Sequence, residues 1–467
     1  MPTHAIRFDS RMSDSDALMW TIESDPVLRS TIIAVAVFDT EPDRARLIER
    51  MERGSRLVPR LRQRVVGSPL SLAPPRWEFD PNFDLSYHLR FWRAPEGGTL
   101  HDVLRLAAPM AMQGFDRARP LWEMVVVDGL AEGRSGMILK LHHAITDGVG
   151  AVKIAAVLFD FEREPGQAQE PTPDPPPVHV MNRLERFRDA FEHERRRQAG
   201  ILDRALPNLI SGAASFVQDP VGRARRSAEV AGSVVRMLAP ANAPLSPIMT
   251  GRSLSVNFEV LSLPLAEAKA VAKAAGTRLN DFFLAAVLGG LRRYHEQHHA
   301  APARLRTSMP INIRDEQTGD VAGNRFAPAR FTVPLQIKDP TERMKVVHAL
   351  VGQVRAEPAL ALVDPLALVL RRAPAFVATG LFGSLLRSVD VITSNVPGIP
   401  VPIYLAGAQM LSQFPFGPRS GAAINITLLS YLDQIHVGVN TDPAAVPDQA
   451  VFAACLTDGF DELLKLA

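Results

Sequence analysis

A proline-rich stretch at 165–177 limits how this chain of 467 residues can fold. Its sequence is Pro-Gly-Gln-Ala-Gln-Glu-Pro-Thr-Pro-Asp-Pro-Pro-Pro, which cannot sustain a helix or a central strand because proline has no amide hydrogen to donate. We therefore predict an extended spacer that divides the chain. The length also favours two domains, so we expect an N-terminal domain over 1–164, a connector over 165–251 and a C-terminal domain over 252–467.

The residues before the spacer alternate between strand and helix patterns. Short runs of β-branched and apolar residues predict strands, and apolar residues at helical spacing predict helices. The predicted strands are 29–38, 124–127 and 136–141, and the predicted helices are 13–24, 44–54, 99–112 and 149–161. This alternation is typical of an α/β layer.

The residues after 251 show the same mixture. Strands are predicted at 254–264, 306–313, 329–335, 390–395, 422–430 and 434–439, and helices at 265–275, 277–291 and 447–466. The helix that starts near 277 is mostly apolar, which predicts burial. The chain therefore looks like two α/β halves of similar build, although no sequence repeat is obvious.

The connector and one later segment each allow two interpretations. Residues 182–239 read as charged helix, with many arginines and interspersed acidic residues, and we favour a solvated helical hairpin over a basic surface for anionic lipid headgroups or cofactor phosphates. Apolar segments within 365–388 could form core, a tunnel wall or a membrane-facing surface. Flanking arginines favour core or tunnel, and exposure of both Phe376 and Phe382 on one patch would reverse that choice.

The composition argues against several classes of partner and site. With 46% apolar and 22% charged residues and a formal net charge of +2, the chain is globular, and its charge gives no reason to expect nucleic acid as a partner. Its one cysteine, Cys455, allows no intrachain disulfide, excludes a cysteine-based zinc site and fits a reducing cytoplasm. Neither a secretory signal nor a membrane-spanning run is evident, so we expect any membrane contact to be peripheral.

Several known catalytic motifs are incomplete in this sequence or absent from it. His295 to His299 match the H-E-x-x-H zinc pattern, but a proline follows at Pro302 and no third histidine has the required spacing, so we expect a solvated helix end and no metal site. The sequence contains no G-x-S-x-G elbow, no phosphate-binding P-loop and no G-x-G-x-x-G turn. Cys455 lies among apolar helix residues, which favours a core position over a nucleophile.

The strongest candidate site is the pair His142 and His143, which follows the predicted strand 136–141. Neighbouring side chains of a strand point to opposite faces, so at most one of the two should reach a given cavity. An imidazole suits proton transfer near neutral pH. The alternative is a pair of structural histidines with Asp147 as a helix N-cap and Gly148 in the first turn. With no evident nucleophile, a histidine base favours direct transfer, in which a substrate hydroxyl attacks a thioester carbonyl.

Four motifs carry a family resemblance. Residues 142–148, His-His-Ala-Ile-Thr-Asp-Gly, resemble the HHxxxDG signature of the CoA-dependent acyltransferase superfamily, which includes chloramphenicol acetyltransferase and peptide-synthetase condensation domains. The chain is also similar to the bacterial wax ester synthase/acyl-CoA:diacylglycerol acyltransferases in three accessory motifs. These are Pro120-Leu-Trp-Glu, Asn280-Asp281 before an apolar helix, and Ser394-Asn-Val-Pro-Gly398.

The resemblance implies an α/β fold of two chloramphenicol-acetyltransferase-like domains, each a mixed sheet flanked by helices, with the active-site tunnel at their interface. It implies that His143 is the general base and that His142 packs away from the tunnel. It also implies that Asp147, next to Gly148, holds the loop through backbone hydrogen bonds or through a buried ion pair with a partner such as Arg314. Asn280 is a candidate donor near the oxyanion, or else a helix N-cap. The residues expected to shape the tunnel are Trp122, Asp281, Asn395, Pro397 and Gly398.

The same resemblance implies the substrates. Acyl-CoA would be the co-substrate, and a diacylglycerol or fatty alcohol the acceptor, giving triacylglycerol or wax ester and free CoA, with no metal and no bound cofactor. Alternatives are another hydroxyl or amine acceptor, or a non-catalytic lipid-binding paralogue. The protein would be cytoplasmic, with peripheral contact at the inner membrane or lipid inclusions.

The sequence departs from the family pattern at two places. We expect these departures to affect the preference for acyl-chain length more than the reaction itself. Ile399 replaces a second proline after Gly398, and Pro26-Val-Leu-Arg-Ser replaces an early Pro-Met-His segment.

Overall fold

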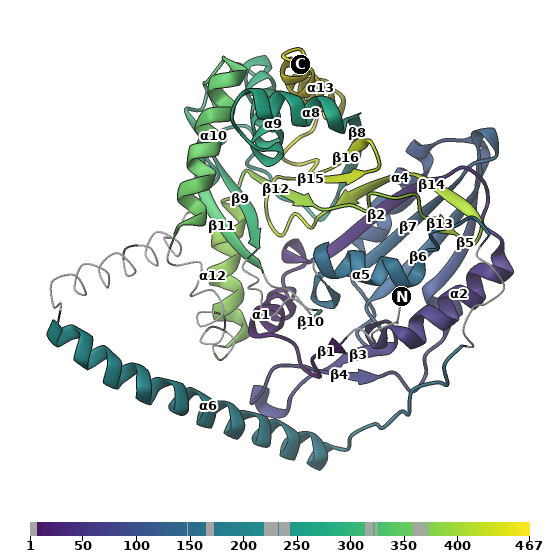
Figure 1. The fold of residues 1–467 in the computed structure, drawn as a ribbon, viewed down its shortest axis with the longest axis vertical. Helices are drawn as coiled ribbons and strands as arrows, with labels where there is room; N and C mark the ends of the chain where they lie inside the picture. The colour runs from purple at the N-terminus through teal and green to yellow at the C-terminus, as the bar shows by residue number, and fades with distance from the viewer. Residues whose placement is uncertain are drawn as a thin grey trace.

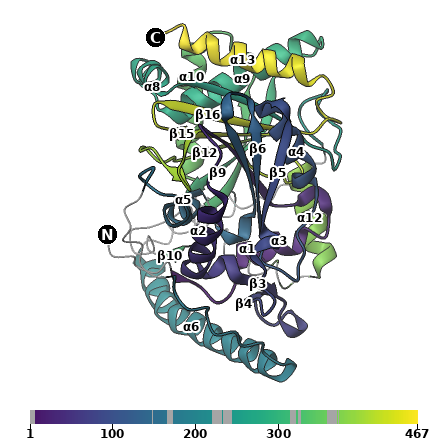
Figure 2. The same cartoon turned by 90° about the vertical axis from the view of Figure 1, so that its right-hand side faces the viewer.

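Two six-stranded mixed sheets form the framework of the protein (Figure 1). The computed structural model describes residues 7–146, 148–164, 172–218, 232, 243–312, 321–322, 326–357, 367, 370, 372 and 374–467. The two sheets lie side by side, and helices cover their outer faces (Figures 1 and 2).

The first sheet has the strand order β13-β14-β2-β7-β6-β5. Its strands are β13 (Tyr404–Leu405), β14 (Ala408–Phe416), β2 (Thr31–Phe38), β7 (Ser135–His142), β6 (Trp122–Leu130) and β5 (Leu89–Gly98). All neighbours are antiparallel except β5 and β6. Residues of β2, β6 and β7 alternate between two apolar clusters, so both faces of this sheet are buried.

Three helices cover the first sheet. On one face, α2 (Arg44–Leu57) and α5 (Gly148–Leu158) contribute buried residues to the same cluster as Trp122 and Met124. On the other face, α4 (Leu100–Met112) packs against Val125 and Ile138. Helix α1 (Asp14–Ile22) precedes β2, and its N-cap is Ser13, whose side chain accepts a hydrogen bond from the amide of Asp16. A short helix, α3 (Leu85–His88), leads into β5.

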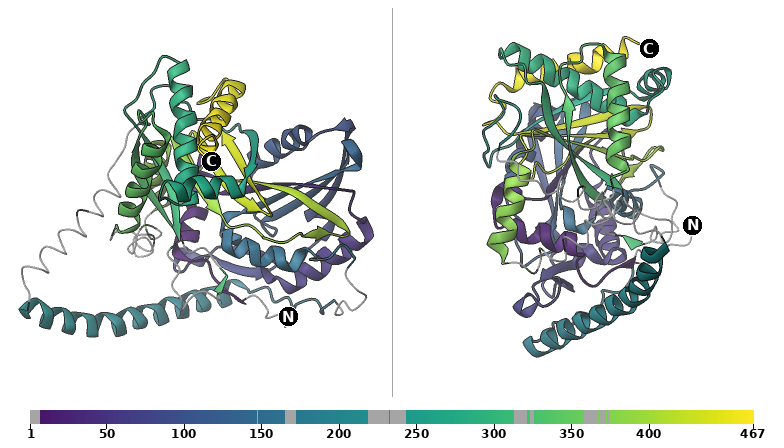
Figure 3. Two further views of the ribbon diagram at one scale, coloured as in Figure 1. Left: turned by 45° about the horizontal axis from the view of Figure 1, so that its top comes forward. Right: turned by 90° about the vertical axis from the view of Figure 1, so that its left-hand side faces the viewer.

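The second sheet has the order β11-β9-β12-β15-β16-β8. Its strands are β11 (Phe326–Pro334), β9 (Arg304–Asn312), β12 (Val391–Val396), β15 (Ile424–Tyr431), β16 (Gln434–Thr441) and β8 (Asn257–Pro264). The helices α8 (Leu265–Ala274), α9 (Leu279–Gln297), α10 (Pro340–Arg355) and α13 (Gln449–Leu464) lie on its outer face (Figure 3). Most of α9 is buried between this sheet and α13, as its apolar sequence predicted.

The two halves are joined through a strand that crosses between them. β14 belongs to the C-terminal half of the sequence but pairs with β2 in the first sheet, and β15 then continues in the second sheet. β14 also packs closely on β16, because a Cβ on Gly438 would lie 1.9 Å from the carbonyl oxygen of Pro415. Only a glycine permits this approach of the two backbones.

A second junction forms between α1 and α12 (Ala375–Arg387). Leu18, Ile22 and Leu28 share an apolar cluster with Ala378, and Phe382 and Leu386 pack against it. One face of α12 is therefore core. Phe376, however, is 78% exposed, so Phe376 and Phe382 do not form one exposed patch. Most of the residues 365–373 lie outside the described residues.

The connector contains one long helix, α6 (Arg183–Gln218), which runs along the outside of the molecule (Figures 1 and 3). Asn182 caps its start, because its side chain accepts hydrogen bonds from the amides of Leu184 and Glu185 at 2.9 and 3.0 Å. The predicted hairpin is represented by this helix alone, since most of 219–242 lies outside the described residues.

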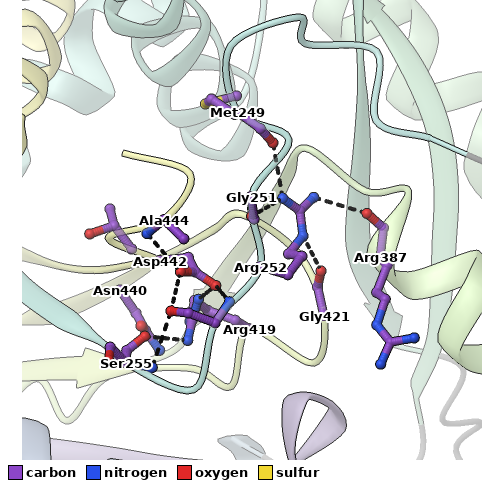
Figure 4. A network of polar contacts seen from close by, with 12 residues as sticks. Met249, Gly251, Arg252, Ser255, Arg387, Arg419, Gly421, Asn440, Asp442 and Ala444 are labelled. Atoms are coloured by element: carbon purple, nitrogen blue, oxygen red, sulfur yellow. Dashed lines mark hydrogen bonds and ion pairs between the residues drawn. The ribbon is translucent and has the colours of Figure 1, made fainter. Parts of the chain in front are cut away.

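A buried polar network fixes the point where the chain enters the second sheet (Figure 4). The guanidinium of Arg252 donates to the carbonyls of Met249, Gly421 and Val389 at 2.6 to 3.0 Å. Asp442 is fully buried, forms an ion pair with Arg419 and accepts from the amide of Ser253 at 2.7 Å. This network joins the segment before β8 to the end of α12, the loop between β14 and β15, and the end of β16.

Most predicted helices and strands are confirmed, with ends that differ by a few residues. Among the elements that were not predicted are β3 (Gln63–Val66), β5, β13, β14, α3, α10 and α12. Two small two-stranded sheets are also present, β3 with β4 (Arg76–Phe79) and β1 (Arg7–Phe8) with β10 (Val321–Ala322).

Candidate functional site

The His-His pair lies where strand β7 ends. His142 is the last residue of β7, and His143 begins a short 3-10 turn over His143–Ile145 that leads toward α5. His142 is 1% exposed, whereas His143 is half-buried. The two adjacent imidazoles therefore have different environments, one sealed in the interior and one with access to the surface of the turn.

His142 is held by hydrogen bonds at both ring nitrogens. The amide of Ala144 donates to its Nδ1 at 3.0 Å, so Nδ1 presents its lone pair and the ring hydrogen is on Nε2. Nε2 then donates to Oε1 of Glu23 at 2.9 Å. This bond pattern fixes both the tautomer and the orientation of the ring.

Glu23 connects this ring to the start of β2. The same Oε1 accepts from the amide of Ser30 at 2.6 Å, and the carbonyl of Ser30 accepts from the amide of His143 at 2.9 Å. Burial raises the pKa of Glu23, but the hydrogen bonds from His142 and from the amide of Ser30 outweigh it and hold that pKa below its ordinary value. Glu23, Ser30 and His142 thus form a closed frame that fixes the backbone of His143.

Aromatic and charged side chains surround this frame. The rings of Trp20 and Phe115 meet His142 edge to face at centroid distances of 5.3 and 5.9 Å. Lys140, two residues before His142 on β7, is fully buried, and its Nζ lies 2.9 Å from Oε1 of Glu123 and 4.4 Å from the Phe115 ring centroid. Burial lowers the pKa of Lys140, and the ion pair with Glu123 opposes that effect.

Trp122 lies one strand away on β6 and is 1% exposed. Its Nε1 donates to the carbonyl of Leu61 at 2.8 Å, and His88 stacks on its ring at a centroid distance of 4.7 Å. Nδ1 of His88 is 2.7 Å from the Trp122 carbonyl, and burial lowers the pKa of His88. Trp122 is therefore a fixed part of the wall beside the turn, in the apolar cluster that also contains Ala144 and Ile145.

The end of β12 and the turn that follows it reach this same cluster from the second half of the chain. Val396 and Ile399 pack against the cluster that holds Ala144 and Ile145, while Asn395 and Pro397 are exposed. A Cβ on Gly398 would lie 1.4 Å from the carbonyl oxygen of Ser430, so only glycine fits here. The structure thus brings the Asn-Val-Pro-Gly segment and the histidine turn to one apolar cluster.

Asn280 and Asp281 lie at the start of α9. The helix begins at Leu279 with Arg278 as its N-cap, so the alternative of Asn280 as N-cap is wrong. The Asn280 amide donates to the sulfur of Met309 at 3.4 Å. Asp281 is buried, accepts from the amide of Arg278 at 2.9 Å, and lies 2.7 Å from Nδ1 of His348 on α10. Its charge is thus used to start α9 and to join α9 to α10.

Two predicted residues, Asp147 and its suggested partner Arg314, lie outside the described residues. Gly148 is the first residue of α5, so the aspartate directly precedes a helix.

The H-E-x-x-H pattern on α9 does not gather a metal site. His295 is buried, with Nε2 2.8 Å from the Ser246 hydroxyl, so the expected solvated helix end is wrong at this residue. Glu296 pairs with Arg292, and His299 lies beyond the helix. Among the residues described, no group of three or more His, Cys, Asp or Glu side chains could hold a metal ion. Cys455 is buried in the core as predicted.

Sequence reasoning missed Glu23, Ser30, Trp20 and Phe115. Lys140 offered a weak signal, because it is a lone charge in an otherwise apolar strand. Ser30 offered another, because it lies in the segment 26–30 that departs from the family pattern. That segment forms a 3-10 turn, Pro26–Leu28, and buries Leu28 completely before it places Ser30 in the frame.

Comparison with known proteins gives consistent matches over the whole chain. The model described as the wax ester synthase/diacylglycerol acyltransferase catalytic domain matches residues 12–283, and the WS/DGAT C-terminal domain matches residues 322–464. A Mycobacterium tuberculosis protein, Rv2484c, whose name assigns it to the diacylglycerol O-acyltransferases, is 39% identical over 463 residues, covering 99% of this chain and 93% of the relative.

Solved structures share the fold. The wax ester synthase/diacylglycerol acyltransferase of Marinobacter aquaeolei VT8 superposes with a TM-score of 0.63 at 22% identity, covering 97% of this chain and 98% of that one. The first condensation domain of the CDA synthetase gives a TM-score of 0.61 at 14% identity, covering 99% and 96%. These matches confirm the predicted two-domain, chloramphenicol-acetyltransferase-like fold.

Proposed function

The chain belongs to the wax ester synthase/diacylglycerol acyltransferase family, and on that premise we propose that it transfers a long-chain acyl group from acyl-CoA to a hydroxyl of a diacylglycerol or a fatty alcohol. The products are triacylglycerol or wax ester and free CoA. The assignment to acyl-CoA-dependent O-acyltransferases follows from the family and the named relatives.

The observation that carries the mechanism is the separation of the two histidines. His142 uses both ring nitrogens to hold the turn, through Ala144 and Glu23. His143 follows it on that turn, half-buried, with its backbone fixed by Ser30. A rigid backbone with a partly accessible imidazole is what a general base requires.

The reaction proceeds by direct attack. The His143 imidazole takes the proton of the acceptor hydroxyl while the oxygen attacks the thioester carbonyl. The tetrahedral intermediate collapses, the carbon–sulfur bond breaks, and the CoA thiolate takes the proton from His143. Asp147, which precedes α5, orients the loop. Asn280 is the proposed oxyanion donor from the second half, and a single fixed donor of this kind contributes about 2.7–4 kcal/mol.

The acyl-CoA and the acceptor meet in a tunnel between the two halves. The Asn-Val-Pro-Gly segment at 395–398 lines it, and the buried ring of Trp122 packs behind its wall. The apolar cluster that both share with the histidine turn supports this arrangement. The reaction as proposed needs no resident metal or cofactor, since acyl-CoA is itself the co-substrate.

The acceptors are lipids, so we also propose that the enzyme works at a membrane or lipid-inclusion surface. Across the described part of the chain, no helix combines the length and the apolar character needed to span a bilayer. Exposed aromatic residues on α6 and α12 support a surface contact.

A release assay tests the proposal. Purified protein is given palmitoyl-CoA with a fatty alcohol, a diacylglycerol or a short polar acceptor, and both free thiol and extracted ester are measured. We expect thiol and ester in equal amounts with the lipid acceptors. Release only with the polar acceptors would assign another substrate class. Binding of acyl-CoA without release under any condition would identify a lipid-binding protein and contradict the enzyme.

A further inference from the structure

Helix α6 exposes large apolar side chains on one side. Leu184, Phe187 and Phe191 are 57%, 41% and 59% exposed. Their spacing places them within about 60° of one another around the helix axis, so they form one stripe. Val178 and Val180, just before the helix, are also exposed. We call Leu184, Phe187 and Phe191 the outer stripe.

The opposite side of α6 is polar and faces the body of the protein. Asp189 forms ion pairs with Arg11 and Arg76, Arg186 with Glu78, and Arg197 with Asp14. Ala190, on the same side, is fully buried. Farther along, Glu194 pairs with Arg372.

This arrangement is the reverse of an ordinary surface helix, which packs its apolar side on the core and turns its charges to water. Here charge pairs hold the helix on the body and leave the aromatic stripe outside. Contiguous exposed apolar side chains mark interaction sites on soluble domains. The charged inner side leaves the outer stripe available for an external partner.

The charges beside the stripe indicate which partner. Arg188 and Arg195 are exposed and, by helical spacing, lie on the side of the outer stripe. Within the part of the chain that the structure describes, no ion pair engages either arginine. Glu192 is the exposed acid nearest to them, and it pairs with Arg196. Asp189 is turned inward to Arg11 and Arg76. Helical spacing places Glu194 about 20° from Phe187, but its charge is neutralised by the ion pair with Arg372.

We propose that the outer stripe docks α6 on a membrane that carries anionic phospholipid. Phe187 and Phe191 insert into the boundary between headgroups and acyl chains, and Arg188 and Arg195 contact the lipid phosphates. The proposal rests on the proposed function, because a lipid acceptor must be drawn from such a surface, and it names the element that makes the contact.

Vesicle flotation tests the docking surface on the full chain. Vesicles contain phosphatidylcholine alone or in equal parts with phosphatidylglycerol. We expect the wild type to bind the anionic vesicles, and Phe187→Ser/Phe191→Ser to lower the binding constant about tenfold or more. Arg188→Glu/Arg195→Glu should lose the preference for anionic vesicles. The matched control is Phe161→Ser, which removes a phenylalanine of similar exposure, 54%, outside α6.

Each result supports or overturns the proposal. Unchanged vesicle binding by the double phenylalanine variant overturns it. A lower molecular mass of the double phenylalanine variant than of the wild type in light scattering, with vesicle binding unchanged, also overturns it. That result identifies the stripe as a contact between two copies of the chain. An equal loss of vesicle binding in the Phe161→Ser control also overturns it, since that loss shows nonspecific adsorption.

Thiol release from palmitoyl-CoA with a fatty alcohol held in detergent micelles, without vesicles, separates this proposal from the proposed function. The double phenylalanine variant should keep wild-type release in that assay. If the wild type itself releases no CoA, the proposed function fails, while the flotation result still decides the docking surface.

Discussion

Glu23 and His142, 119 positions apart in the sequence, are joined by a 2.9 Å hydrogen bond between Oε1 and Nε2. The bond closes a frame in which Ser30 holds the backbone of the next residue, His143. Glu23 is therefore a positioning residue. It fixes the position of the proposed base, His143, through Ser30 and His142.

Replacing Glu23 with alanine should reduce turnover through the position of His143. The amide of Ser30 and Nε2 of His142 would lose their acceptor, at a cost of about 1–3 kcal/mol each in unfolding free energy. Because small misplacements of a reacting group are costly, kcat should fall by about tenfold or more, with the KM for acyl-CoA little changed.

Steady-state kinetics check this expectation, with Glu23→Gln as the rescue. The amide oxygen of glutamine can still accept both hydrogen bonds, so this variant should recover most of kcat. Glu164→Ala, which removes an exposed carboxylate, is the control. An equal loss in the Gln variant, or a rise in KM alone, would contradict the positioning role.

Asp442→Ala should be strongly destabilising. Asp442 is fully buried and neutralises Arg419, whose side chain is 10% exposed, so its loss leaves a nearly buried charge without its partner (Figure 4). Breaking such a pair costs about 3–5 kcal/mol. Urea unfolding measures the change. Arg134→Ala, which breaks an exposed pair with Glu132, should cost less than about 1 kcal/mol, and similar values for both variants would argue against a special role for the network.

Gly398→Ala and Gly352→Ala should change stability in opposite directions. A Cβ at Gly398 would overlap the carbonyl of Ser430, so alanine there must push apart β15 and the segment beside the histidine turn. At Gly352, inside α10, nothing lies within 4 Å, and alanine should stabilise the helix by up to about 1 kcal/mol. Melting temperatures test the pair. A Gly398 variant as stable as the wild type would show that the close approach is not needed.

The pH dependence of stability should include a contribution from His436 on β16. Burial lowers the pKa of His436 to about 4, from 6.5. Between these values the unfolded chain binds a proton that the folded chain does not, so this contribution is complete above about pH 6.5 and is lost as the pH falls toward 4. The full effect is on the order of 3 kcal/mol.

His436→Gln should therefore flatten the loss of unfolding free energy between pH 7.5 and 5, as measured by urea unfolding. Exposed His101 gives the control, and His101→Gln should keep the wild-type slope. A His436 variant with the same slope as the wild type would contradict the assignment.

The sequence was most informative where patterns are local. Helix α9 and the strand into His142 have regular apolar spacing, so both were predicted near their observed positions. The adjacent histidines were also proposed as the centre of the candidate site, because a known signature carries them.

Contacts between segments that lie far apart in the sequence could not be predicted. Nothing in the sequence of β14 indicates that it leaves its own half and pairs with β2, because either sheet could accept such an apolar strand. Glu23 lies at the end of an ordinary helix, and its importance depends on where β2 and β7 bring Ser30 and His142. The outward stripe of α6 was hidden as well, because helical spacing shows that an apolar side exists and not which way it faces.

The most direct test of the account compares His143→Ala with the wild type in the thiol-release assay with palmitoyl-CoA and a fatty alcohol. We expect kcat to fall by roughly 10²–10⁴, the range for loss of a general base, while the melting temperature stays close to that of the wild type. A folded His143→Ala protein that keeps wild-type turnover would contradict the role of His143 and the direct mechanism built on it.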